Sequence, residues 1–426
     1  MREKNSTEAV ESSAVCYDTL EQGARGKIQA QLQQLLEEEV TTFLGRARHE
    51  RRGTVSPIDP PTGSRNGYGN PRAFSMLSGP VTVRRPRVRD LTERFESKVL
   101  PLFKRRTQEV GTLLPELYLH GLSTGDFDLA LRGLLGEGAP LSASSIQRLK
   151  ARFELEYTAW KKRDLSDLAV VYWWADGLYV KAGITDRKSA RLTIVGVLTT
   201  GEKIVLACAS GERESKERWL TILRDLKNRG LTFPQLTVAD GHLGIWAAFG
   251  EIHPTGEEQR CRNHKITNVL NDLPKKAQPK AAELLKAMPY AETKAECERR
   301  RDAFVRTYHK TDKKAVETLL RDGDRMVTFY SFPREHWRHL RTTNIVESPF
   351  SSVRLRTDAA RRYKRVEGAT AIIWKMLQVA EQAWRKLNAP ELVPLVASGR
   401  TFKDGIVLKS GHDKNDRNHQ PERTAA

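Results

Sequence analysis

Cysteine is scarce in this chain of 426 residues, which has only Cys16, Cys208, Cys261 and Cys297. Four widely spaced cysteines do not form the disulfide framework of a small secreted protein. Long apolar runs are also missing, since no stretch approaches the roughly 20 residues that span a membrane. The first residues are polar and lack the apolar region of a signal peptide. We therefore expect a soluble, cytoplasmic protein.

Acidic residues are too few to balance the basic ones. The chain has 53 Asp and Glu against 72 Lys and Arg, which gives a net charge of +19 and a pI near 9.8. Such an excess along the whole chain favours a polyanionic partner, above all nucleic acid. The alternative is that the charge only keeps the protein soluble. With 39% hydrophobic residues, the chain can form two or three globular domains.

Two short apolar segments each lead into an Asp-Gly pair. Residues 236–239 indicate a buried strand that ends at Asp240, after which Gly241 allows a turn into a helix. Residues 168–175 indicate a similar strand that ends at Asp176. Carboxylates at the carboxyl ends of strands lie at the rim of an α/β sheet, where ligands bind. We therefore predict that Asp176 and Asp240 share divalent metal.

The periodicity around these two acids predicts a mixed α/β fold. Three strands form an antiparallel meander and are followed by a helix, a strand, a helix and a strand, an order typical of a ribonuclease H-like sheet. Residues 178–182 either extend the first strand or pair with it. The expected strands are 168–175, 192–198, 203–209, 236–239 and 259–261, and the expected helices are 214–229, 242–252 and 263–273.

Glu347 is the candidate for a third carboxylate, which sites of this kind commonly need. On a helix it would share one face with Asn344, Ser351 and Arg354. Because Pro349 is tolerated only in the first turn, we expect Glu347 at or just before the helix start. Oxygen ligands favour Mg²⁺ or Mn²⁺, and two such ions about 3.5–4 Å apart support in-line phosphoryl displacement. Alternatively, Glu347 is a surface carboxylate that neutralises nearby arginines.

Basic side chains gather in segments on both sides of the expected site. A short extended ribbon near residues 81–89 suits phosphate contacts, although a solvated linker would look the same. Helices within 102–164 are compatible with a helix-turn-helix reader of DNA or with an ordinary bundle. The candidate DNA contacts are Arg65, Asn66, Tyr68, Arg84, Arg85, Arg87, Arg89, Arg148, Lys150, Arg152, Asn344, Arg354, Arg356, Arg361 and Arg362.

Seven short motifs, taken in order, resemble the mutator-type transposases, a bacterial insertion-sequence family related to plant Mutator elements. They lie at residues 65–68, 118–124, 175–177, 227–230, 239–244, 259–264 and 342–348. The resemblance implies a ribonuclease H-like catalytic core with an Asp-Asp-Glu triad and a helical insertion before the Glu. Asp176, Asp240 and Glu347 match the triad.

The motif at 259–264 contains Cys261 and His264, which fit the family's Cys-x-x-His element. Two ligands are at most half of a zinc site, and Cys297 and His309 have no supporting spacing, so we interpret the pair as structural support near the active site. His242 either positions a nucleophile or caps a helix. Of the adjacent Trp173 and Trp174, one should be core, while the other could face a base or a helix.

The resemblance implies a DNA transposase that binds terminal inverted repeats, cleaves DNA with Mg²⁺ or Mn²⁺ and joins the ends to target DNA. It also implies a homodimer or higher oligomer that is associated with the bacterial nucleoid. A catalytically silent DNA-binding regulator and a nuclease that only hydrolyses are the alternatives. The expected regions are a flexible arm (1–22), an N-terminal helix with a basic ribbon (23–100), a DNA-binding helical domain (101–165), the first part of the core (166–273), a helical insertion (274–335), the last part of the core (336–398) and a disordered tail (399–426).

Overall fold

The computed structural model describes residues 5–50, 62–91, 95–101, 107–122, 130, 143–183, 188–211, 214–241, 243–359 and 363–408. The chain divides into two compact units, Met1–Leu149 and Lys150–Ala426. Within the described residues, every helix is too short or too polar to cross a membrane.

The long helix α1 (Asn5–Leu44) organises the first unit and ends where Gly45 adopts a left-handed φ of +65°. Leu36 of α1 packs with Phe74, Val81 and Val83 of a strand pair into a small apolar core. The other elements of the unit are β1 (Thr62–Tyr68) paired with β4 (Pro86–Leu91), β2 (Arg72–Met76) paired with β3 (Gly79–Val83), and α2 (Gln108–Leu119).

Both ends of the chain are more regular than the sequence pattern predicts. The expected arm, residues 1–22, is helical from Asn5 onward, because Glu and Ala residues such as Glu8 and Ala9 favour helix even without an apolar stripe. The expected tail contains a short hairpin of β10 (Phe402–Lys403) and β11 (Ile406–Val407). Residues 409–426 lie outside the described residues, and so do residues 123–142 of the expected DNA-binding helical domain, apart from residue 130.

A five-stranded sheet forms the centre of the second unit, in the order β7-β6-β5-β8-β9. β5, β6 and β7 form the predicted antiparallel meander, whereas β8 and β9 run parallel to β5. The unit therefore has the expected mixed α/β character. The strands are β5 (Val170–Lys181), β6 (Lys188–Leu198), β7 (Lys203–Gly211), β8 (Leu236–Ala239) and β9 (Glu257–Arg260).

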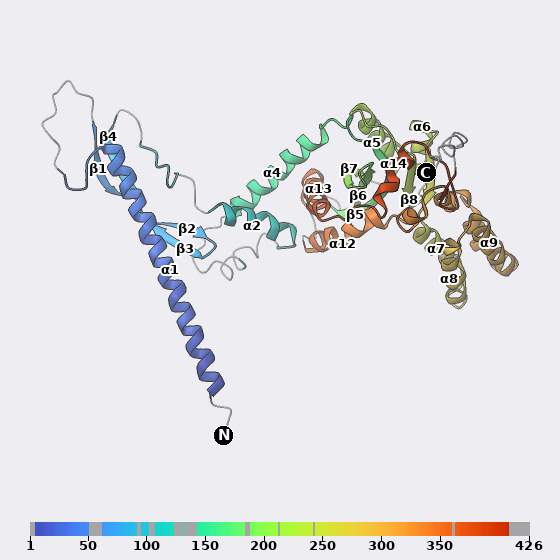
Figure 1. Cartoon of the computed structure of the whole chain (residues 1–426), viewed down its shortest axis with the longest axis horizontal. Helices are drawn as coiled ribbons and strands as arrows, with labels where there is room; N and C mark the ends of the chain where they lie inside the picture. The colour runs from blue at the N-terminus through green and yellow to red at the C-terminus, as the bar shows by residue number, and fades with distance from the viewer. Residues whose placement is uncertain are drawn as a thin grey trace, which may run out of the picture. The chain divides into compact units, whose positions relative to one another are not determined.

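Helices cover both faces of this sheet (Figure 1). α5 (Lys216–Asn228) and α6 (Leu243–Ile252) pack on one face, and the buried side of α5 is the one its periodicity predicts. α12 (Asn344–Ala359) and α13 (Val366–Gln382) lie against the other face. α4 (Ala143–Lys161) also reaches this sheet, since the hydroxyl of Tyr157 donates to the backbone oxygen of Cys208 at 2.6 Å.

Side-chain alternation along β5 decides which residues face the candidate site. Trp173 and Ala175 belong to the apolar core with α5 and α6. Tyr172 and Trp174 point to the other face, where they bond to His336 and to the backbone oxygen of His339. Both tryptophans are thus core residues, and Trp174 faces a helix rather than a base. Asp176, two residues further along, shares the face of Trp174.

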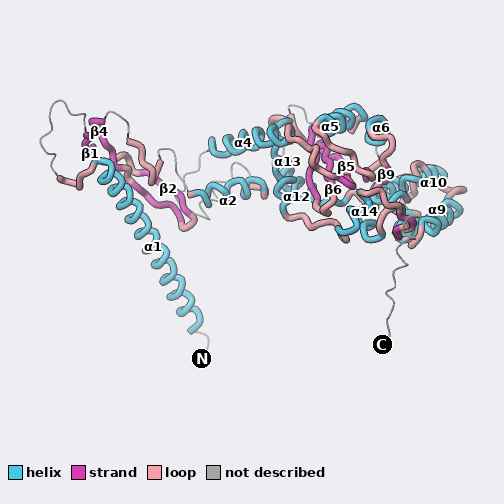
Figure 2. Tube along the Cα trace, turned by 45° about the horizontal axis from the view of Figure 1, so that its top comes forward, coloured by secondary structure: helices cyan, strands magenta, loops and turns pink. Residues whose placement is uncertain are grey.

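The residues between β9 and α12 are mostly helical. Most of them lie beyond the β9 edge of the sheet (Figure 2), whereas His336 and His339 lie against its face. A buried ion pair between Arg260 of β9 and Asp322 ties them to the sheet. These elements are α7 (Arg262–Asn271), α8 (Gln278–Ala287), η1 (Met288–Tyr290), α9 (Lys294–Tyr308), α10 (Lys313–Leu320), η2 (Asp324–Met326), η3 (Thr328–Ser331), η4 (Arg334–His336) and α11 (Trp337–Leu340). After α13 follow η5 (Pro390–Leu392) and α14 (Val393–Ala397).

Candidate active site

Strand register places Asp176 and Asp240 side by side. Ala175 of β5 pairs in parallel with Ala239 of β8, and each acid is the next residue. β8 ends at Ala239, and Gly241 turns the chain with a φ of +92°. Of the two alternatives for residues 178–182, the structure has the extension of the first strand. β5 does not end at Asp176 but continues to Lys181, because its residues keep pairing with β6.

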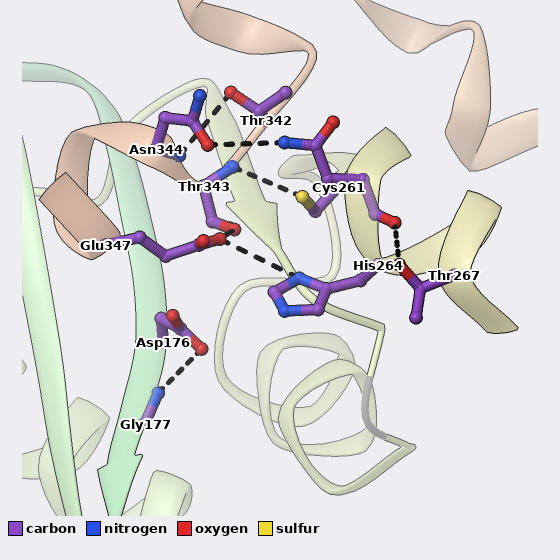
Figure 3. A network of polar contacts seen from close by, with 10 residues as sticks. Asp176, Gly177, Cys261, His264, Thr267, Thr342, Thr343, Asn344 and Glu347 are labelled. Carbon is purple, nitrogen blue, oxygen red and sulfur yellow. Dashed lines mark hydrogen bonds and ion pairs between the residues drawn. The ribbon is translucent and has the colours of Figure 1, made fainter. Parts of the chain in front are cut away.

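Glu347 reaches the same place from the first turn of α12 (Figure 3). The hydroxyl of Thr343 donates a hydrogen bond to its carboxylate, and the Glu347 N–H bonds to the Thr343 carbonyl at 3.0 Å. The expectation that Pro349 limits the helix start is wrong, since Pro349 lies inside α12. The helix begins earlier because the Thr342 hydroxyl accepts a hydrogen bond from the Asn344 N–H at 3.4 Å.

Burial and nearby negative charges both raise the pKa of the Asp176 carboxyl group. Its side chain is buried, and the Gly177 N–H donates to it at 2.8 Å. Burial raises the pKa of Asp176 to about 7, and the negative charges of Asp240 and Glu347 add to the rise. The Gly177 hydrogen bond and the charge of His264 act in the opposite direction. Three acids that are remote in sequence therefore interact at one place.

Cys261 and His264 lie beside the three acids and form the other side of the candidate site. Cys261 is buried between β9 and α7, and its Sγ accepts a hydrogen bond from the Thr343 N–H at 3.4 Å. A hydrogen bond with Cys261 and the charges of Asp176 and Glu347 raise the pKa of His264 to about 9. His264 Nδ1 lies 3.9 Å from Glu347 Oε1. These contacts favour the protonated form of His264 as long as no metal ion is bound to its ring.

Two overlapping donor sets could hold a metal ion. The first set, Asp176, Asp240 and Glu347, offers only oxygen atoms. The raised pKa of Asp176 indicates that this buried carboxylate has too little positive charge near it, which a metal cation would supply. This set fits Mg²⁺ or Mn²⁺. Cys261, His264 and Glu347 have donor atoms within 4.8 Å of one another, and among the described residues neither Cys297 nor His309 joins them. His242 lies outside the described residues.

Comparison with known proteins decides the family of this chain. The family model described as "Transposase, Mutator family" matches residues 1–386. The chain belongs to this family. It is 43% identical over 304 residues to the transposase for insertion sequence element IS6120 of Mycolicibacterium smegmatis, covering 71% of this chain and 94% of that protein. It is 41% identical over 279 residues to the transposase for IST2 of Acidithiobacillus ferrooxidans, covering 65% and 94%.

One solved structure, the HTLV-2 integrase catalytic core domain in complex with magnesium, matches with a TM-score of 0.17 and 18% identity. The match covers 28% of this chain and 85% of the integrase chain.

The DNA contacts expected for this Mutator-family chain have different environments. Arg65 is held by α1, through an ion pair with Glu37 at 2.9 Å and a hydrogen bond to Thr41. Tyr68, Arg85 and Lys150 are half-buried. Arg356 is only 3% exposed, so its side chain lies on the buried side of α12 rather than on a surface that DNA could contact. Arg361 and Arg362 lie outside the described residues. The exposed candidates are Asn66, Arg84, Arg87, Arg89, Arg148, Arg152, Asn344 and Arg354.

Sequence reasoning missed three residues at this site. Thr343 holds Glu347, and Asn263 donates to Asn344 at 3.3 Å. Asn263 lies in the motif at 259–264 and Thr343 in the motif at 342–348. Their closeness in sequence to His264 and Glu347 was the signal that could have identified them. Glu214 is buried directly over Gly177, where any Cβ would collide with its carboxylate. The sequence around Glu214 gives no sign of this role.

Proposed function

We propose that this chain is the transposase of an insertion sequence, which cuts DNA at the ends of its element and joins them to target DNA. The observation that carries the proposal is the convergence of Asp176, Asp240 and Glu347 beside His264. Family membership and relatives named as insertion-sequence transposases agree with it.

The three carboxylates would hold a pair of divalent ions. Such a pair, when bound, activates the attacking hydroxyl and stabilises the leaving oxygen of a phosphodiester. Asp176 and Asp240 are fixed by neighbouring strands, while Glu347 is held by the Thr343 hydroxyl. In its protonated form, His264 would attract the DNA phosphate toward these acids.

The remaining organisation supports the same proposal. The strand order and the helical residues between β9 and α12 favour a ribonuclease H-like core with a helical insertion before the catalytic Glu. The exposed arginines Arg84, Arg87 and Arg89 in or beside β3 and β4 would contact DNA phosphates in the first unit. Bringing two element ends together requires at least a homodimer, which would act at the nucleoid.

The test is an assay with duplexes that carry the terminal repeats of the element. We expect the full-length chain to join their 3′ ends to target DNA with Mg²⁺ or Mn²⁺, and EDTA to stop the reaction. Cleaved ends without joined products would identify a nuclease that only hydrolyses. Binding without any cleavage would identify a silent regulator, and either result contradicts the proposal.

Loss of the Thr343 hydroxyl should weaken metal use. Thr343→Val removes the donor that orients the Glu347 carboxylate but keeps the side-chain shape. Removing a group that orients a metal ligand costs about 10–100-fold in metal affinity or activity, so we expect strand transfer to need more Mg²⁺. The measurement is the rate of joining against Mg²⁺ concentration. Thr343→Ser keeps a hydroxyl and should behave like the parent, and equal curves for all three proteins would refute the role of Thr343.

A further inference from the structure

A polar hollow opens beside the candidate active site, between α7 and α8. It has a volume of about 360 Å³, near the lower end of the range of about 300–1,000 Å³ for small-molecule sites. Ile266 and Leu270 supply an apolar surface, whereas Asn263 and Thr267 supply hydrogen-bonding groups. Arg262 and Lys286 add two positive charges, and none of the described residues that line the hollow is acidic. This combination suits a ligand with an anionic group and a flat apolar part.

Tyr290 at the edge of this hollow is unusually exposed for an aromatic residue, at 61%. Its hydroxyl accepts a hydrogen bond from Arg262 at 2.9 Å. The guanidinium carbons of Arg262 and Arg341 lie 4.6 and 5.1 Å from the ring centroid. Cation–π contacts of this kind hold the ring in place without burying it. Tyr290 therefore keeps a fixed position while much of its surface stays exposed, as a ring that contacts a ligand requires.

The hollow and the acids are both reached from α7, because Thr267 lines the hollow and His264, one turn earlier, lies beside Glu347 (Figure 3). Asn263, which lines the hollow, donates to Asn344 at 3.3 Å, and the next residue is His264 of the candidate active site. The Arg262 N–H donates to the Arg341 carbonyl at 2.9 Å, which fixes α7 against the segment that leads to Thr343. A DNA strand with its phosphate at the acids would therefore place a neighbouring nucleotide at the hollow.

We propose that this hollow binds one unpaired nucleotide beside the scissile phosphate, with its base on Tyr290 and its phosphate at Arg262 and Lys286. This inference rests on the proposed function. Stacking on Tyr290 needs a free base face, which neighbouring bases cover in a duplex, so the nucleotide must leave the helix. Leaving the helix costs a few kcal/mol. DNA that is already unpaired at this position should consequently bind more tightly than paired DNA.

The test compares two DNA ends, one fully paired and one with a few unpaired nucleotides at the cleavage position. The full-length chain carries Asp240→Asn so that no turnover occurs, and 2-aminopurine at the unpaired position reports stacking. Tyr290→Ala should reduce the preference for the unpaired end by about 5- to 150-fold, the range for one base–aromatic stack. Tyr290→Phe keeps the ring and should retain most of the preference. Leu320→Ala, an exposed position on α10 outside the hollow, should change nothing.

A matched pair on α8 tests the phosphate contact. Lys286 lines the hollow and Lys280 does not, although both are exposed and both substitutions to Ala remove one charge. We expect only Lys286→Ala to lower the affinity for the unpaired end.

An unchanged preference in Tyr290→Ala, or an equal loss in Leu320→Ala, would overturn the inference. A change in oligomeric mass without a change in preference would also overturn it, because Tyr290 would then contact a second copy of the chain. If the parent joins DNA ends but the preference for the unpaired end does not depend on Tyr290, only the nucleotide site is rejected. If the parent never joins ends while the preference depends on Tyr290, the transposase proposal is rejected and the nucleotide site stands.

Discussion

Replacing Asp176 by asparagine should reduce strand transfer at least about 10³-fold, the scale for removing a group that acts on the reacting atoms. The amide keeps the shape and the hydrogen-bonding capacity of the side chain but removes its negative charge. Burial and the negative charges of Asp240 and Glu347 disfavour the charged form of Asp176. A bound cation would offset both effects. We expect DNA binding to remain close to the parent value.

Asp240→Asn and Glu347→Gln should have effects of the same size, because the three acids act together on one ligand. The combined variant should be little worse than any single one, since groups that act as a unit are not additive. The matched control is Asp302→Asn on α9, whose side chain is 53% exposed and pairs with Arg301 at 3.1 Å. Joining and binding are measured on the same DNA ends. Near-parent joining by Asp176→Asn would remove the basis of the proposed mechanism.

The pairing of Asp176 and Asp240 was predictable because it follows from local rules. Each acid follows a short apolar strand, and parallel neighbours bring equivalent positions to one edge. The continuation of β5 beyond Asp176 was less predictable. Gly177 normally indicates a turn, but here it stays in the strand through its pairing with Leu192 of β6, and Glu214 occupies the space where a side chain would lie. That contact joins segments almost forty positions apart, which local pattern does not report.

The start of α12 illustrates a different limit. Pro349 suggested a helix that begins near Glu347, because proline lacks an N–H. The actual start at Asn344 depends on capping by Thr342 and on the contact of Thr343 with Cys261, which comes from the end of β9. A tertiary contact therefore overrides the local signal. The same contact network brings Glu347 to the two aspartates, so spacing in the sequence could propose the triad but not its geometry.

Replacing Trp173 by alanine should lower the free energy of unfolding of the second unit by about 3–5 kcal/mol, the usual cost of truncating a buried Trp. The side chain is fully buried, and its ring lies 5.1 Å from Phe233 and 5.3 Å from Phe249. Its Nε1 also donates to the Thr237 hydroxyl on β8 at 2.6 Å. The substitution thus leaves a cavity and also removes the partner of a buried hydroxyl.

This tryptophan also connects stability to the site, because its bond to Thr237 joins the two strands that carry Asp176 and Asp240. Trp173→Phe should keep most of the packing but lose that bond, and so should fall between the parent and Trp173→Ala. Urea unfolding followed by far-ultraviolet circular dichroism measures the differences. Leu155→Ala is the matched control, since Leu155 is 73% exposed on α4 and its loss should cost less than about 0.5 kcal/mol. If Trp173→Ala unfolds at the same urea concentration as Leu155→Ala, the sheet does not depend on this core, and the strand pairing that brings the two aspartates together must be maintained in another way.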